Sequence, residues 1–346
     1  MDLAKRIKAF SKLGQLLPVA VRDPSYELGQ AALSAQHVNP WFTPENVVFA
    51  VDSIASAWLK TGELENWVHA YPKRFFNPAM AKRVGVIMAG NIPLVGFHDF
   101  LSVLITGHAI NIKISSKDGG VMSAVAKMLV DIEPNFDPFI QISEGILKGF
   151  DAVIATGSDS SVRYFDFYFR NYPSLIRGHR NGIALLTGNE TNDELALLSN
   201  DIFTYFGLGC RNVSKLLVPQ GYNFTNLIEH MAKWQHLVNY HRYANSYEYN
   251  RTLLIMNQLP HLDTGFTLIV PNENIDAPVA MVNYQEYSSI KSAIDYIDLN
   301  DSKIQCVASL VDVGHGRRVN FGDTQQPKLN DYSDGIDTIE FLGSIG

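Results

Sequence analysis

The chain has 346 residues, of which 46% are hydrophobic and 18% charged, and its formal net charge is -7 at pH 7. This composition predicts a globular protein of one large or two ordinary domains, and the acidic balance argues against a nucleic-acid partner. Two cysteines, Cys210 and Cys306, cannot build a disulfide framework, and neither they nor the histidines show metal-ligand spacing. We therefore expect a cytoplasmic protein without a metal site.

The first 83 residues are expected to be mostly helical. Apolar and basic residues alternate at helical spacing over residues 1–17, unlike the unbroken apolar core of a signal peptide. A helix that packs its apolar stripe on the protein fits this pattern, and a helix lying on a membrane surface is the alternative. No apolar run approaches the roughly 18 residues that span a bilayer, so we expect no membrane span.

From residue 84 the pattern changes to short apolar runs that alternate with helical stretches. Strands are predicted at 84–89, 109–114, 138–142 and 151–156, and helices at 94–107 and 121–132. Pro93 is expected to begin the first of these helices, because proline is tolerated in a first turn. The alternation predicts a parallel sheet flanked by helices.

A second α/β unit is predicted after Arg180. Its strands are expected at 183–187, 213–219, 266–270, 278–284 and 304–311, and its helices at 192–206, within 223–259 and at 288–299. The tail is rich in Gly, Asp and Asn, and its last apolar run, 338–342, predicts a short strand. This tail has the character of an arm, not of a domain.

Cys210 is the first candidate for chemistry. It follows Gly207 and Gly209, which allow tight backbone conformations and close approach of a ligand, and Arg211 beside it favours the thiolate electrostatically. Most lone cysteines are small buried hydrophobic residues, and Cys306, inside an apolar strand, fits that description. Cys210 remains open between that role and a nucleophile.

Polar residues also follow the predicted strands of the first unit. Asn91 follows strand 84–89, where it would either cap the next helix or donate its amide to an oxyanion. Lys113 lies at the end of strand 109–114, where open α/β sheets bind ligands, although a solvated lysine is the alternative. Ser158 or Asp159 would cap a helix after strand 151–156, where free backbone amides could hold phosphate. Neither common nucleotide-binding glycine motif is present.

Four motifs in order, "AGNIP" (89–93), "INIKISSKD" (110–118), "ATGSDSS" (155–161) and "GLGCRNVSK" (207–215), resemble the aldehyde dehydrogenase superfamily. The resemblance is greatest to the acyl-CoA reductase (LuxC-like) branch and covers roughly residues 84–320. It implies a helical and dinucleotide-binding domain (1–180), a cysteine-bearing catalytic domain (181–318) and a C-terminal oligomerisation arm (319–346). The arm would return to the first domain or join a partner subunit, which suggests a homodimer.

The resemblance also implies roles for individual residues. Cys210 would be the nucleophile, and the Asn91 side chain would form the oxyanion hole with the Cys210 backbone N–H. The cofactor-binding residues would be Lys113, Ser115, Ser116, Lys117, Thr156, Gly157 and Ser158. Because Ser116, followed by Lys117, stands where NAD-preferring members often have a glutamate, we expect NADPH, with NADH possible.

Three departures from the superfamily pattern are informative. The stretch "SLIRGHRNG" (174–182) has Ile176 or Arg177 where aldehyde-oxidising members have a glutamate that activates water. "NIDAP" (274–278) replaces the segment that contacts the nicotinamide ribose, and Val162 replaces a glycine near the pyrophosphate. Without a base for hydrolysis, an acyl-enzyme would survive until a hydride reaches it.

The sequence therefore predicts an NADPH-dependent acyl-CoA reductase that releases an aldehyde. His179, near the position of the missing glutamate, is a candidate for proton transfer, with a structural histidine as the alternative. An aldehyde dehydrogenase or an acyl-phosphate reductase of the same fold remains possible, and so does a cofactor-binding scaffold without turnover.

Overall fold

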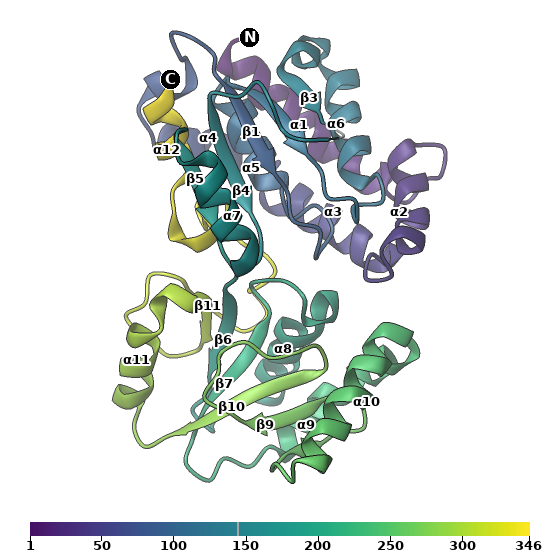
Figure 1. Cartoon of the computed structure of the whole chain (residues 1–346), viewed down its shortest axis with the longest axis vertical. Helices are drawn as coiled ribbons and strands as arrows, with labels where there is room; N and C mark the ends of the chain where they lie inside the picture. The colour runs from purple at the N-terminus through teal and green to yellow at the C-terminus, as the bar shows by residue number, and fades with distance from the viewer. Residues whose placement is uncertain (144) are drawn as a thin grey trace. The chain divides into compact units, whose positions relative to one another are not determined.

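The computed structural model describes residues 1–143 and 145–346, and these form two compact units. The first unit contains residues 1–179 together with 327–346, and the second contains residues 180–326. Each unit is an α/β structure with its own sheet (Figure 1). No helix in the described part of the chain combines the length and apolar character needed to cross a membrane.

The first unit is built on a parallel sheet with the strand order β3-β2-β1-β4-β5. Its strands are β1 (Arg83–Ile87), β2 (Ala109–Lys113), β3 (Ile140–Ile142), β4 (Ala152–Thr156) and β5 (Ser174–Arg177). Its α-helices are α1 (Leu3–Ala20), α2 (Glu27–Val38), α3 (Pro44–Ala57), α4 (Thr61–His69), α5 (Phe97–Ile105), α6 (Val121–Ile132), α7 (Asp159–Phe169) and α12 (Thr338–Ile345). The short 3-10 helices are η1 (Lys73–Phe76), η2 (Pro134–Phe139) and η6 (Ser333–Gly335).

The N-terminal helix α1 packs its apolar face into the first unit. Phe10, Leu13 and Leu17, at helical spacing, are completely buried in the main core, whereas Lys5 and Lys8 are exposed. Phe10 makes edge-to-face contacts with Phe100 and Phe136. The helix is therefore the packed element expected from the sequence.

The second unit has a mixed sheet with the order β12-β11-β6-β7-β10-β9-β8, in which only β8 and β9 are antiparallel neighbours. Its strands are β6 (Asn181–Leu185), β7 (Val213–Pro219), β8 (Leu262–Asp263), β9 (Leu268–Pro271), β10 (Met281–Tyr287), β11 (Ile304–Ser309) and β12 (Arg318–Val319). Its α-helices are α8 (Asn192–Phe203), α9 (Thr225–Met231), α10 (His241–Met256) and α11 (Ile290–Leu299). The 3-10 helices are η3 (Thr204–Gly207), η4 (Ala232–Asn239) and η5 (Asp301–Lys303).

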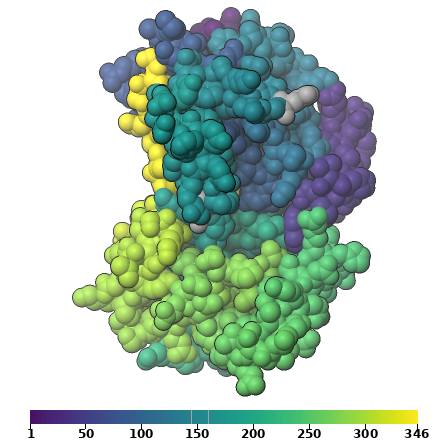
Figure 2. Space-filling view, viewed as in Figure 1, coloured from purple at the N-terminus to yellow at the C-terminus, as the bar shows by residue number. Residues whose placement is uncertain are grey.

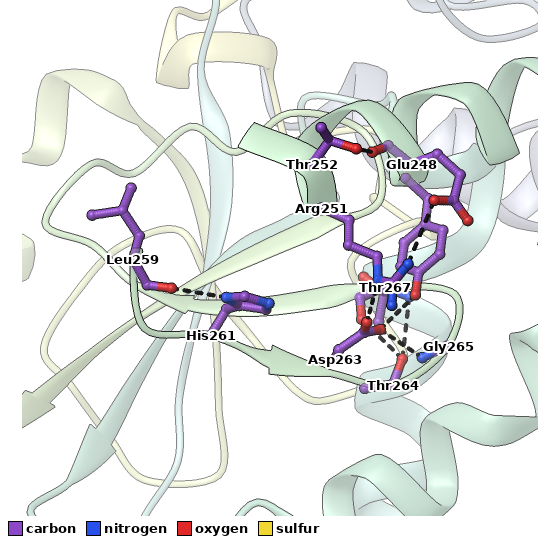
Figure 3. Close-up of polar contacts among 10 residues, drawn as sticks. Glu248, Arg251, Thr252, Leu259, His261, Asp263, Thr264, Gly265 and Thr267 are labelled. Atoms are coloured by element: carbon purple, nitrogen blue, oxygen red, sulfur yellow. Dashed lines mark hydrogen bonds and ion pairs between the residues drawn. The ribbon is translucent and has the colours of Figure 1, made fainter. Parts of the chain in front are cut away.

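A polar clamp joins α10 to the turn between β8 and β9. The Asp263 carboxylate accepts hydrogen bonds from Tyr247 Oη (2.5 Å), Arg251 Nε (2.7 Å) and the Gly265 backbone N–H (2.9 Å) (Figure 3). Burial alone would raise the pKa of the Asp263 carboxyl, but the hydrogen bonds from Tyr247, Gly265 and Arg251, together with the Arg251 charge, outweigh it and hold the pKa below its ordinary range. The clamp fixes α10 to the β8–β9 edge of the sheet.

The predicted strand at 338–342 is wrong, because this stretch is the helix α12. Asp337 is its N-cap, and its Oδ1 accepts hydrogen bonds from the Ile339 and Glu340 backbone N–H groups at 2.9 and 3.0 Å. A five-residue apolar run does not distinguish a strand from a helix, and the cap decides the outcome. An arm strand for pairing with a partner is therefore not formed here, and the homodimer stays a prediction.

The C-terminal segment 327–346 is an integral part of the first unit. Leu329, Tyr332, Ile339 and Leu342 belong to its main core. In Figure 2 the segment forms a yellow band along the surface of the first unit. The Tyr332 hydroxyl, which accepts from Trp67 Nε1 and also hydrogen-bonds the Tyr71 hydroxyl, ties the segment to α4, with both distances 2.7 Å.

Candidate active site

Strand ends in the first unit bring several of the predicted cofactor residues to one edge of the sheet. Ile87 at the end of β1 is in register with Lys113 of β2 and with Ala155 of β4, and Thr156 is in register with Arg177 of β5. In the order β3-β2-β1-β4-β5 the direction of connection reverses between β1 and β4. Ligands of open α/β sheets bind outside the carboxyl ends of the strands at such a point.

Asn91 lies in the loop between β1 and α5 and does not cap that helix. The N-cap of α5 is Gly96, with no side-chain cap, so the predicted beginning of this helix at Pro93 is wrong. Leu94 has a φ of 56°, which interrupts any helix between Pro93 and Gly96. The capping role considered for Asn91 is therefore excluded, and its side chain is half-buried.

The loops after β1 and β2 are in direct contact. A Cβ atom at Gly90 would lie 2.3 Å from Ser115 Oγ, so only glycine fits there without a shift of that side chain. The contact places Asn91 and Ser115 in neighbouring loops of the same sheet edge. Ser115 Oγ also accepts from the Lys117 backbone N–H at 3.3 Å, which shapes the turn that carries Ser116 and Lys117, both exposed.

Asp118 was not singled out by the sequence analysis, yet it organises this turn. Its buried carboxylate accepts a hydrogen bond from the Met122 backbone N–H (2.9 Å) at the start of α6. Burial raises the pKa of this carboxyl, and hydrogen bonds from the backbone of residues 120–122 oppose the shift. The Asp118 carboxylate is therefore directed toward the first residues of α6. The two lysines of this region differ in exposure, because Lys113 is half-buried and Lys117 is exposed.

Ser158 caps α7, as one of the two sequence alternatives proposed. Its Oγ accepts from the Ser161 backbone N–H at 3.4 Å and lies 2.9 Å from Ser160 Oγ. Gly157 precedes it at a tight position, where a Cβ atom would lie 2.8 Å from the Cβ of Ser161. Thr156, Gly157 and Ser158 thus form the connection between β4 and α7 at the reversal point of the sheet.

Cys210 lies in the second unit, in a turn between η3 and β7. The Asn212 backbone N–H donates to the Gly209 carbonyl at 3.0 Å, so Cys210 and Arg211 are the two central residues of the turn. Cys210 is partly exposed, whereas Cys306 of β11 is fully buried. The turn therefore presents a thiol, and the other cysteine is a core residue.

Gly182 of β6 packs closely against the backbone of the Cys210 turn. A Cβ atom at this position would lie 2.6 Å from the Arg211 carbonyl oxygen and 2.7 Å from that of Asn212. Gly182 is also in register with Val213 of β7 and with Cys306 of β11. The turn thus lies at the amino ends of these strands, not at the carboxyl ends that the open-sheet rule favours for ligands.

Comparisons with known proteins identify the family of this chain and its fold. The acyl-CoA reductase (LuxC) family matches residues 64–238, which are half of the chain. This chain belongs to the acyl-CoA reductase (LuxC) family. A long-chain acyl-protein thioester reductase from Vibrio harveyi is 28% identical over 136 residues, but the match covers only 36% of this chain and 26% of that relative.

Solved aldehyde dehydrogenases share the fold. One from Physcomitrella patens, in complex with succinate, gives a TM-score of 0.69 at 12% identity, covering 100% of this chain and 84% of that chain. One from Pseudomonas aeruginosa gives 0.64 at 13% identity, with 90% and 72% covered. An indole-3-acetaldehyde dehydrogenase variant from P. syringae, in complex with NAD+, gives 0.63 at 12% identity, with 89% and 72% covered. The fold and the family expected from the sequence are both confirmed.

In this LuxC family member, Arg177 is a buried structural residue. Its Nη1 contacts both carboxylate oxygens of Asp99 on α5 at 2.8 Å, and its Nη2 donates to Thr338 Oγ1 at 2.7 Å. Both members of the ion pair are buried. Arg177 therefore anchors α12 to the sheet. His179, two residues later, is exposed at the end of the first unit, and its role in proton transfer stays a prediction.

Segment 272–276, which overlaps the "NIDAP" segment, is fixed by side chains that bind every one of its carbonyl groups. The donors are Lys215 Nζ to Asn272, Tyr296 Oη to Glu273 (3.0 Å), Asn283 Nδ2 to Asn274 (3.1 Å) and Asp276 (2.8 Å), and Ser214 Oγ to Ile275 (2.7 Å). Lys215 is fully buried, and burial lowers its pKa to about 8.

Asp201 at the end of α8 is a second carboxylate that sequence reasoning missed. Its Oδ1 accepts from Thr324 Oγ1 (2.8 Å) and the Thr324 N–H (3.2 Å), and its Oδ2 accepts from the Gly322 N–H (2.6 Å). The Thr324 carbonyl in turn accepts from Arg211 Nε at 2.5 Å. Asp201 thus links α8, residues 322–324 and the Cys210 turn. No group of three or more His, Cys, Asp or Glu residues within the described ranges could hold a metal ion.

Burial raises the pKa of Asp201 from its ordinary value of 3.8 to about 6, which makes stability depend on pH. Between these values the folded protein holds a proton that the unfolded chain has lost, so the free energy of unfolding falls as pH rises, by at most about 3 kcal/mol. We expect the stability advantage of the wild type over Asp201→Asn to shrink from pH 4 to pH 6.5. Urea unfolding at both pH values measures this, and an advantage that stays constant would contradict it.

Proposed function

We propose that this protein is an NADPH-dependent acyl-CoA reductase that forms an aldehyde through an acyl-enzyme on Cys210. The observation that carries the proposal is a partly exposed thiol at the centre of a fixed turn, in a chain of the LuxC family. The match to the curated relative spans only about a quarter of that protein, so activity and substrate are proposed here from the residues of this chain.

The proposed cofactor site is the edge of the first sheet. Lys113 and Lys117 supply positive charge, and Ser115, Ser116 and Ser158 supply hydroxyl groups. The acid in the same turn, Asp118, is occupied by the backbone of α6 and does not face a ligand as a free carboxylate. A 2′-phosphate is attracted by two ammonium groups and repelled by a carboxylate, and this charge pattern favours NADPH over NADH. Thr156 and Gly157 would lie along the cofactor.

In the proposed reaction the Cys210 thiolate attacks the thioester carbonyl carbon of acyl-CoA. The carbon–sulfur bond to CoA breaks, and CoA leaves as a thiolate that takes up a proton. We assign the Asn91 amide and the Cys210 backbone N–H to the negative oxygen of the tetrahedral intermediate. NADPH, when bound, would supply the hydride that converts the enzyme thioester to the anion of a thiohemiacetal. Collapse of this anion would break the carbon–sulfur bond and free the aldehyde and the Cys210 thiolate.

Hydrolysis of the acyl-enzyme would require a base that activates water. Residues 174–182 contain no aspartate or glutamate. Arg177 in this stretch is held by Asp99 and Thr338, so neither this side chain nor the carboxylate it binds is available for that task. The absence of a carboxylate that could activate water in this stretch favours reduction over the release of an acid.

A substrate panel tests the proposal. We expect oxidation of NADPH, followed by its absorbance, with acyl-CoA thioesters of graded chain length, and a lower kcat/KM with NADH. Removing the charge in Lys117→Met should raise the KM for NADPH by about tenfold and leave the KM for NADH nearly unchanged, as for a lost charge-assisted contact.

Turnover with acyl phosphates but not with acyl-CoA would instead identify an acyl-phosphate reductase. Oxidation of aldehydes to acids would identify an aldehyde dehydrogenase, and a lack of any turnover would favour the scaffold.

A further inference from the structure

The buried side chain of Asn212 binds the backbone on both sides of the segment that leads into the Cys210 turn. Its Oδ1 accepts from the Gly209 backbone N–H at 2.7 Å, and its Nδ2 donates to the carbonyls of Asp201 and Thr204, both at 2.9 Å, with a third carbonyl, that of Ile202, at 3.3 Å. The residue is 2% exposed. Because its own backbone N–H also binds the Gly209 carbonyl, Asn212 contacts both polar backbone groups of Gly209.

The chain between these contacts is strained. Tyr205 and Phe206 have φ values of 55° and 60°, and Gly207 follows with a φ of 75°. The left-handed region costs roughly 1–2 kcal/mol for each residue with a side chain. Such strain persists only where the surroundings fix the backbone, and Phe206 is held by edge-to-face packing on Tyr240, with the ring centroids 4.9 Å apart.

Asn212 spans this strained stretch. Thr204, whose carbonyl it binds, immediately precedes the left-handed residues, and Gly209, which it also binds, follows them. The amide therefore connects the end of α8 directly to the residue before Cys210. Without it, the backbone from 205 to 209 would lose the bonds that offset its strain and could relax.

We propose that Asn212 is a positioning residue that holds the sulfur and the backbone N–H of Cys210 in one orientation for attack on the acyl group. This rests on the proposed role of Cys210 as the nucleophile. The four hydrogen bonds of its side chain described above all go to backbone groups, so Asn212 acts on the reaction through the turn. A displacement of about 1 Å at a reacting group can reduce the rate by roughly a hundredfold.

The test compares Asn212→Ala with a matched control, Asn250→Ala. Asn250 is also a buried asparagine of the second unit, and its Nδ2 donates to the Val279 carbonyl at 3.0 Å, but it lies on α10. We expect both variants to lose thermal stability. Only Asn212→Ala should lose kcat, by about tenfold to a hundredfold, with a nearly unchanged KM for acyl-CoA.

Alkylation of Cys210 by iodoacetamide gives a readout that needs no turnover, because Cys306 is fully buried. We expect a severalfold faster alkylation in Asn212→Ala and a wild-type rate in Asn250→Ala. If Asn212→Ala does not fold, Asn212→Asp, which keeps the acceptor for the Gly209 N–H but loses the donor, takes its place. It should likewise lose kcat and speed alkylation.

Equal alkylation rates and equal kcat values in wild type and the Asn212 variants would overturn the proposal, and so would equal losses in the Asn250 control. Failure of the proposed function has a different signature. The wild type itself would then not reduce acyl-CoA, while the alkylation rates would still report whether Asn212 holds the turn.

Discussion

Replacing Cys210 with alanine is expected to reduce acyl-CoA reduction by at least about 10⁴-fold, because the covalent route is lost with the nucleophile. After mixing with acyl-CoA in the absence of NADPH, the wild-type protein should gain the mass of one acyl group, and the variant should gain none. Intact mass spectrometry measures both. Peptide mapping should place the adduct on Cys210.

Cys306→Ala is the matched control for this experiment. Cys306 is fully buried in β11, and its thiol makes a long contact of 3.7 Å with the Arg211 carbonyl. Its loss should lower stability slightly and leave the acyl adduct in place. An adduct that persists in Cys210→Ala, or none in the wild type with any thioester, would be incompatible with the acyl-enzyme.

Loss of the C-terminal segment 327–346 is expected to unfold the first unit. Four core side chains would be removed, and truncation of one buried Leu alone typically lowers the free energy of unfolding by about 2–5 kcal/mol. Domains are stable by only about 5–15 kcal/mol. The deletion would also remove the hydrogen bond between Arg177 and Thr338. Hydrogen exchange at the amides of β1, β2 and β4 should become fast.

Two point variants in α12 test whether the buried side chains of this helix, and not any change in the C-terminal segment, stabilise the first unit. Leu342 is completely buried, and Leu342→Ala should lower the free energy of unfolding by about 2–5 kcal/mol. Ser344 is exposed in the same helix, and Ser344→Ala should change it by less than about 0.5 kcal/mol. Equal effects of the two substitutions, or slow exchange in the truncated protein, would show that the segment is not part of the core.

The long apolar strands could be predicted because their burial leaves a direct pattern in the sequence. The predictions at 109–114 and 151–156 are confirmed as β2 and β4, both almost wholly buried. β5 was missed, because its four residues include Arg177, whose burial depends on Asp99 far away in sequence. The helix α12 was taken for a strand, because its cap at Asp337 lies outside the apolar run.

The sequence identified candidate site residues only where they belong to a recognisable motif. Cys210, Asn91 and Lys113 were found because each follows or ends a recognisable element, and their functional roles stay predictions. Asn212 and Asp201 were missed because they bind mostly backbone groups. A backbone N–H or carbonyl is present at almost every position, so a hydrogen bond to one does not require a particular residue type at the partner position. The sequence therefore gives no sign of which backbone group such a side chain binds.

The return of the last segment to the first unit affects the order in which the protein folds on the ribosome. The second unit is continuous from Arg180 to Gln326, whereas the first needs Leu342 to complete its core. Domains generally fold as their chain emerges, N-terminal part first. Here the N-terminal half must wait with apolar surface uncovered until the later unit has been synthesised, which makes the nascent chain a client for chaperones.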